Sequence, residues 1–143
     1  MRIKQLNLDC CGCTGPLNNA KGLIEIMKNS ARAAGAKVIG SKVQNYPKYG
    51  LTAIVFLAES HILVSTYPEI NYAVVEVFMC NNQMNPAECG RLIAKYLKSA
   101  RIVSNEFFHS ISKTDLRVGY RASARINKIP MVLRQKPTPT NNF

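Results

Sequence analysis

Long apolar runs are absent from this chain of 143 residues, and none approaches the roughly 20 residues that a membrane-spanning helix needs. The opening residues 1–6 (MRIKQL) also lack the apolar core of a signal peptide. Both absences argue against a membrane-bound or exported protein. We therefore expect a soluble, cytoplasmic protein with no membrane partner.

Cysteines are few and odd in number, five in all, which argues against the disulfide framework of a small secreted domain. Cys10 and Cys13 form a C-x-x-C motif. A structural zinc site would need a second close pair, but Cys80 and Cys89 are widely spaced and His109 is isolated. We expect no metal. A redox-active dithiol stays open, and a reduced cytosolic pair beside a turn is the favoured interpretation.

Acidic residues are scarce, and the formal net charge is +11. From Arg91 onward, eleven lysines and arginines face only Glu106 and Asp115. Such a region could attract a polyanion. However, its basic residues alternate with apolar ones, and the chain has neither an RNA-binding aromatic signature nor C₂H₂ zinc-finger spacing. A solvated face is therefore favoured, and we expect no nucleic-acid partner.

The length and the apolar content of 47% fit one ordinary globular domain. We expect that domain to span residues 1–110. Residues 111–143 would form a basic C-terminal extension, with a disordered tail from about residue 136.

Apolar periodicity and turn residues predict the order β-α-β-β-β-β-α-β. The expected helices run from residue 18 or 19 to about 34, where Gly35 follows, and from 86 to about 99. Their inward faces are predicted to carry Leu23, Ile24, Met27 and Ala31 in the first, and Ala87, Leu92, Ile93, Tyr96 and Leu97 in the second. The expected fold class is α/β (α+β), a two-layer sandwich with a mainly antiparallel sheet and two helices packed on one face.

The most unusual stretch follows residues 50–58, whose short apolar run is typical of a fully buried strand. Glu59, Ser60 and His61 then place a carboxylate, a hydroxyl and an imidazole in succession, before residues 62–64 resume an apolar strand. No Gly, Asn or Asp separates the two strands, although hairpin loops favour them. The intact junction should therefore hold strained backbone, and strain collects at functional sites.

Four motifs carry a family resemblance. They are Ala58-Glu59-Ser60-His61, Thr66-Tyr67-Pro68-Glu69, Val77-Phe78-Met79-Cys80 and Leu8-Asp9-Cys10-Cys11-Gly12-Cys13. The chain resembles the small prokaryotic S-adenosylmethionine decarboxylases from about residue 6 to about residue 103. The resemblance implies self-cleavage between Glu59 and Ser60, with Ser60 converted into a covalent pyruvoyl group. It also implies a homodimer of processed protomers, with active sites near the subunit interface, for polyamine (spermidine) biosynthesis.

Decarboxylation leaves a carbanion, so the enzyme must supply an electron sink. The chain has no strand–loop–helix glycine motif and no paired zinc ligands to hold another cofactor. A pyruvoyl group derived from Ser60 would supply the sink as a Schiff base with the amine of a small-molecule substrate. The resemblance implies that Cys80 is the proton donor to the carbanion. Without the resemblance, Cys80 would be an ordinary cysteine at a strand end.

The resemblance assigns four further positions. Thr52 would stabilise the processing intermediate, Tyr46 and Tyr67 would stack on adenine, and Glu69 would bind the ribose. Asp9 has a weaker claim to lie near the site. Each position also has an ordinary explanation, either as strand packing or as a packed side chain at a sheet edge.

Two positions depart from the family pattern. Ser65 stands where the family has a histidine that removes the Ser60 proton, and Gln5 stands near another family histidine. General-base assistance is worth about 10²- to 10⁴-fold in rate. Either His61 or a water-relayed group therefore takes over, or processing is slow, or processing has been lost. A pyruvoyl-dependent decarboxylase of ornithine or arginine stays open as an alternative. So does an unprocessed homologue that binds a nucleoside ligand or a partner subunit.

Overall fold

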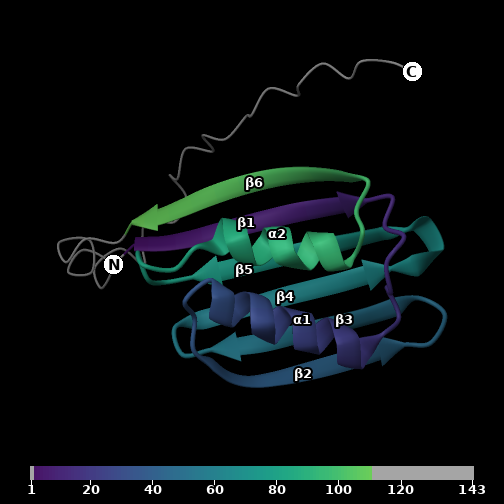
Figure 1. Ribbon diagram of the computed structural model, residues 1–143, viewed down its shortest axis with the longest axis horizontal. Coiled ribbons are helices and arrows are strands. Elements are labelled where there is room, and N and C mark those ends of the chain that lie inside the picture. The colour runs from purple at the N-terminus through teal and green to yellow at the C-terminus, as the bar shows by residue number, and fades with distance from the viewer. Residues whose placement is uncertain (1, 111–143) are drawn as a thin grey trace, which may run out of the picture. The chain divides into compact units, whose positions relative to one another are not determined.

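The computed structural model describes residues 2–110, which form a six-stranded sheet with two helices on one face (Figure 1). The strands are β1 (Arg2–Cys11), β2 (Val38–Tyr46), β3 (Gly50–Leu57), β4 (Ser60–Tyr67), β5 (Tyr72–Met79) and β6 (Arg101–Ser110). The helices are α1 (Ala20–Ala33) and α2 (Pro86–Tyr96), and a short 3₁₀ turn, η1 (Pro68–Ile70), follows β4. The spatial order is β2-β3-β4-β5-β1-β6, and every pair of neighbours is antiparallel. The predicted fold class is confirmed.

Side chains alternate between the helix-covered face of the sheet and the opposite face, which neither helix covers among residues 2–110 and which we call the free face (Figure 1). In β5, Ala73, Val75, Val77 and Met79 are buried while the residues between them are partly exposed. The prediction that residues 50–58 form a fully buried strand was wrong. Thr52 and Ile54 are half-buried and Phe56 is 41% exposed, because α1 packs against the other face of β3 only.

Helix α1 begins and ends as its sequence predicts. The Asn19 side chain accepts a hydrogen bond from the Gly22 amide at 2.9 Å, which caps the first turn. Gly35, with a φ of +86°, ends the helix in the left-handed conformation. Of the predicted inward face, Leu23, Met27 and Ala31 are fully buried, and Ile24 is partly buried.

Helix α2 differs from its prediction in length and in part of its buried face. It ends at Tyr96 rather than near residue 99. Of the predicted inward face, Ile93 and Leu97 are fully buried and Tyr96 is partly buried, but Ala87 is exposed and Leu92 only half-buried. The buried face also includes three residues that were not predicted, Cys89, Gly90 and Ala94. The reason is Gly90: a methyl group there would come within 2.8 Å of both Leu6 and Leu8, so its absence lets the helix lie directly on β1. Tertiary packing therefore set the orientation of this helix.

The predicted basic extension, residues 111–143, and its disordered tail lie outside the described residues, so this domain assignment stays a prediction. Within the described part of the chain, no helix is long and apolar enough to cross a membrane.

Candidate active site

The β3–β4 hairpin closes through Ala58 and Glu59 alone, because Leu57 pairs directly with Ser60. Glu59 is exposed in this turn. The backbone strain of this tight turn lies at Ser60, whose φ of +152° is one that residues with a side chain rarely adopt. The strain expected from the missing turn residues is thus located at Ser60 itself.

Cys80 lies beside this turn. Ser60 pairs across β4 and β5 with Met79, and Cys80 follows Met79 at the end of β5. Cys80 is half-buried. The structure therefore brings Glu59, Ser60 and Cys80 to one end of the sheet, which we call the turn end.

His61 is the next residue after Ser60 and lies on the free face of the sheet. Its Nε2 atom is 3.0 Å from Oε1 of Glu76 on β5. Its ring stacks on Phe78, with ring centroids 5.4 Å apart and planes 9° from parallel. Both side chains of the His61–Glu76 pair are about one-third exposed. The imidazole is therefore held by a hydrogen bond and a stacking contact at once.

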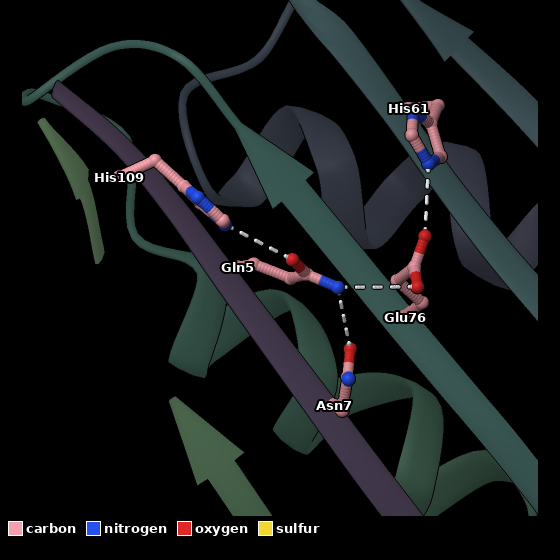
Figure 2. Close-up of polar contacts among 5 residues, drawn as sticks. All are labelled: Gln5, Asn7, His61, Glu76 and His109. Carbon is pink, nitrogen blue, oxygen red and sulfur yellow. Dashed lines mark hydrogen bonds and ion pairs between the residues drawn. The ribbon is translucent and has the colours of Figure 1, made fainter. Parts of the chain in front are cut away.

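Gln5, which departs from the family pattern, holds the other side of Glu76 (Figure 2). Its Nε2 atom donates to Oε2 of Glu76 and to Oδ1 of Asn7, each at 3.3 Å. Its Oε1 atom accepts a hydrogen bond from Nε2 of His109 at 3.3 Å. A continuous polar row thus crosses four strands, from His61 on β4 to His109 on β6.

The opposite end of the hairpin forms a cavity of about 320 Å³. We call this the cavity end; its lining residues are Tyr46, Tyr49, Leu51, Thr52, Ser65, Thr66, Tyr67 and Glu69. Thr52 Oγ1 and Ser65 Oγ are 3.0 Å apart, because the two residues are direct partners across β3 and β4. Four predicted site residues besides Thr52 therefore share this cavity: Tyr46, Ser65, Tyr67 and Glu69.

Backbone packing fixes the shape of the cavity end. Thr66 Oγ1 is buried and accepts a hydrogen bond from the Leu51 amide at 3.0 Å. Gly50 has a φ of +93°, and a methyl group there would come within 2.2 Å of the Thr66 carbonyl oxygen. Only glycine fits at this close approach of the two strands.

Asp9 adds a carboxylate near this end. It pairs with Val74, which in turn pairs with Ser65. Tyr72 donates a hydrogen bond to Asp9, and this bond raises the pKa of Tyr72 to about 12. The Tyr72 ring lies 5.8 Å from that of Tyr67. Asp9 therefore reaches the cavity end indirectly, through two tyrosines.

The two ends lie apart within one chain. Ser60 and Ser65 are five residues apart on β4, which at about 3.3 Å per residue separates them by roughly 16 Å. A side chain at position 65 cannot span this distance to its own Ser60. The predicted site residues thus form two groups rather than one.

The thiols of the C-x-x-C motif are free. All five cysteines fall within the described residues, and none forms a disulfide. Burial raises the pKa of the Cys10 thiol, and the Cys13 thiol donates to the Cys10 carbonyl at 3.3 Å. A buried, protonated thiol is a poor nucleophile, which is consistent with a reduced structural pair.

Sequence reasoning missed three residues: Tyr49, Tyr72 and Glu76. Glu76 carried a signal, since it is a lone carboxylate in the otherwise apolar strand β5. Tyr49 and Tyr72 had none, because their proximity to the cavity end depends on strand pairing. Asp9 was recognised without its partner for the same reason.

The chain matches the family model described as S-adenosylmethionine decarboxylase over residues 4–110. It belongs to this family. An S-adenosylmethionine decarboxylase proenzyme of Acetivibrio thermocellus is 31% identical over 108 residues, which cover 75% of this chain and 87% of the relative. A proenzyme of the same name from Methanococcus maripaludis is 33% identical over 96 residues, covering 66% of this chain and 79% of the relative.

A solved structure supports the fold independently. The adenosylmethionine decarboxylase of Aquifex aeolicus superposes with a TM-score of 0.71 and 23% sequence identity, over 78% of this chain and 92% of that one. At this identity the similarity establishes the arrangement of strands and helices. The family membership rests on the sequence comparisons.

Proposed function

We propose that the chain is a self-cleaving, pyruvoyl-dependent S-adenosylmethionine decarboxylase, a carboxy-lyase that serves polyamine biosynthesis. The observation that carries this proposal is the strained Ser60 directly after Glu59, with Cys80 beside it, in a chain whose relatives are named proenzymes. No feature of the site favours ornithine or arginine over S-adenosylmethionine.

The turn end fits the formation of a pyruvoyl group. Glu59 is the second residue of the two-residue hairpin loop and Ser60 is the first residue of β4, so cleavage between them leaves both strands paired with their outer neighbours. The positive φ of Ser60 is relieved when its amide bond is broken. When formed, the group would supply the electron sink that decarboxylation requires.

Self-cleavage uses the atoms of Glu59 and Ser60. Ser60 Oγ attacks the Glu59 carbonyl carbon, and the amide C–N bond breaks to give an ester and a free amine. Loss of the Ser60 Cα proton then forms a Cα=Cβ bond and expels the Glu59 carboxylate. Tautomerisation to the imine and addition of water release ammonia and leave the keto group. A base near Ser60 must accept the Cα proton.

After cleavage, Cys80 would hold the proton that the decarboxylated carbon needs. Its half-buried place beside Ser60 limits exchange with bulk water. At the cavity end, Tyr46 and Tyr67 offer aromatic faces that suit both adenine and a sulfonium, and Glu69 offers acceptor oxygens for ribose hydroxyls. The two ends together provide chemistry and recognition.

A complete site requires two copies of the chain, because the turn end and the cavity end of one copy lie roughly 16 Å apart along β4. A two-fold dimer formed through the free face would place the cavity end of one protomer against the turn end of the other. The free face supports this arrangement because it carries exposed or half-buried apolar side chains, namely Phe56, Leu63 and Phe78. We therefore include a homodimer with shared sites in the proposal.

Intact-mass measurement tests the cleavage. We expect chains of 59 and 84 residues, the larger beginning with a pyruvoyl group. Carbon dioxide release from carboxyl-labelled S-adenosylmethionine, ornithine and arginine then tests the substrate. Release from either amino acid but not from S-adenosylmethionine would contradict the substrate assignment. An uncut chain that releases nothing would favour the unprocessed binding protein.

Subunit mixing tests the shared site. Ser60→Ala damages the turn end and Glu69→Ala damages the cavity end, so each homodimer should be inactive or weak. Co-expressed at equal levels, they form mixed dimers with one intact site, and activity should recover to roughly a quarter of the unmodified protein. Recovery only on co-expression, with none when both substitutions lie on one chain, would support the shared site; no recovery would contradict it.

A further inference from the structure

We propose that Glu76 is a positioning residue that orients His61 as the base of self-cleavage. This inference rests on the proposed self-cleaving function and assigns a role to the polar row of Figure 2. Its starting point is that His61 immediately follows the serine that must lose its Cα proton.

Two contacts determine the orientation of the His61 ring. The stack on Phe78, with planes 9° from parallel, sets the plane of the imidazole. The hydrogen bond from Nε2 to Glu76 at 3.0 Å sets its rotation within that plane. A side chain held in both ways has little freedom left, which is the condition for a well-placed base.

The hydrogen bond also selects the tautomer. An ionised carboxylate can only accept, so Glu76 places the proton of a neutral His61 on Nε2 and leaves the lone pair on Nδ1. Nδ1 is the ring nitrogen bonded to Cγ, and hence the nitrogen nearer the backbone of Ser60 and His61. No described residue forms a hydrogen bond with Nδ1 of His61. The basic atom therefore has no described hydrogen-bond partner, and it is bonded to Cγ of the residue that follows Ser60.

Glu76 is itself held in place. Its second oxygen accepts a hydrogen bond from Nε2 of Gln5 at 3.3 Å. The orientation of the Gln5 amide is set at its other end, where Oε1 accepts from His109 at 3.3 Å. Both carboxylate oxygens are thus engaged, and their directions are fixed from β4 and β1 at once. A carboxylate anchored on one side and bonded to an imidazole on the other is the usual device for orienting a histidine.

Ser65 cannot serve as the base of self-cleavage. It lies five residues along β4 from Ser60, and its hydroxyl is engaged with Thr52 at 3.0 Å. A serine hydroxyl has no basicity near neutral pH, so position 65 cannot accept the Cα proton even from a second protomer. In the step we assign, the Cα–H electrons form the Cα=Cβ bond, Glu59 leaves as a carboxylate and Nδ1 of His61 carries the proton away.

The test follows self-cleavage of freshly synthesised precursor by intact mass over time. We expect His61→Ala to slow cleavage by about 10²- to 10⁴-fold, the usual worth of a general base. Glu76→Gln should slow it by about 10- to 100-fold, as loss of an orienting partner does. Glu76→Asp should recover part of the rate. The matched control is Glu106→Gln, a strand carboxylate on β6 that should leave the rate unchanged.

The double variant separates positioning from general damage. If Glu76 acts through His61, the substitution Glu76→Gln should add almost nothing to the effect of His61→Ala. If Glu76→Gln slows cleavage of the His61→Ala variant by the same factor as it slows cleavage of the unmodified protein, the proposal is overturned. Restoration of the family histidine by Ser65→His should change the rate by less than about tenfold if His61 is the base. A much larger acceleration would also contradict it.

Two measurements distinguish failure of this inference from failure of the proposed function. In His61→Ala the ester should form and persist, so hydroxylamine, which cleaves esters, should split the chain between residues 59 and 60. No cleavage of any variant, with or without hydroxylamine, would overturn self-cleavage itself. In the uncut Ser60→Ala protein, ¹⁵N NMR should find the His61 proton on Nε2, with that preference lost in Ser60→Ala/Glu76→Gln. An unchanged tautomer would overturn the role of Glu76. This conclusion does not depend on whether the substitution also lowers the thermal stability of the protein.

Discussion

The two ends of the β3–β4 hairpin differ in backbone strain and in the side chains that they carry. At the turn end the backbone is strained, the loop has two residues, and the proposed reactive groups are Ser60 and Cys80. At the cavity end the strands are clamped together by Thr66 and Gly50, and the cavity is lined mostly by tyrosines and hydroxyls. In the proposed function, the turn end breaks a bond in the chain and the cavity end holds the ligand.

Under the proposed function, this difference lets a small sheet carry both tasks. Bond cleavage needs a segment whose neighbours do not depend on it, and the turn end provides it because cutting the loop leaves the other strand pairings of β3 and β4 in place. Recognition needs a rigid surface, which the register of β3 and β4 provides by placing Thr52 opposite Ser65. The distance between the ends is the reason why our proposal includes a second copy of the chain.

The largest effect should come from Ser60→Ala at the turn end. Without Oγ no ester can form, so the chain should stay at its full length of 143 residues and have no decarboxylase activity. Intact mass and carbon dioxide release measure both outcomes. Binding at the cavity end should persist. Cleavage of this variant at the same bond would contradict the self-processing mechanism.

The second-largest effect should come from Cys80→Ala, which keeps the Ser60 hydroxyl but removes the proposed proton donor. We expect cleavage to proceed at the normal rate, whereas the decarboxylation rate falls by about 10²- to 10⁴-fold. Cleavage and activity should therefore separate in this variant. Cys89→Ala, at a fully buried cysteine in α2, is the control for loss of a thiol. Equal losses of activity in both variants would contradict a specific role for Cys80.

Much of this contrast could be predicted from local sequence. The start of the first helix at residue 18 or 19 and its end at Gly35 both depend on a few neighbouring residues, and both were predicted correctly. The strain at Ser60 was also predicted, because it follows from the absence of turn residues between two apolar runs. Local signals were sufficient wherever the determining contacts are local.

Other features depend on contacts between distant segments. Gly90 packs against Leu6 and Leu8 and orients α2, so the helix periodicity alone found only part of its buried face. The polar row joins residues up to 104 positions apart, which a single sequence does not reveal. The division of the candidate site into two ends follows from strand register. The roles assigned to the site residues stay predictions.

At the cavity end, Tyr67→Ala should weaken binding of S-adenosylmethionine by about one to two powers of ten, since stacking on an aromatic ring is worth roughly 1–3 kcal/mol per base. Titration calorimetry on the uncut Ser60→Ala protein measures binding apart from chemistry. The control is Ile70→Ala, an exposed apolar residue in η1 that does not line the cavity. Equal weakening by both substitutions would contradict the stacking role. Cleavage should be unaffected by either, which sharpens the division between the ends.

The smallest effect concerns Tyr72 and Asp9, beside the cavity end. The hydrogen bond to Asp9 raises the pKa of Tyr72 from 10.0 to about 12, because it stabilises the neutral phenol in the folded protein. Its contribution to stability is therefore complete below pH 10 and is lost as the pH rises through about 12.

We expect Tyr72→Phe to lower the free energy of unfolding by about 1 kcal/mol at pH 8, the net worth of one such bond. The difference from the unmodified protein should shrink as the pH rises above 10, in urea titrations at a series of pH values. Tyr49→Phe, at a tyrosine that is 65% exposed, should have no such effect. A destabilisation by Tyr72→Phe that is independent of pH would mean that packing against Tyr67, and not the bond to Asp9, holds this side of the cavity end in place.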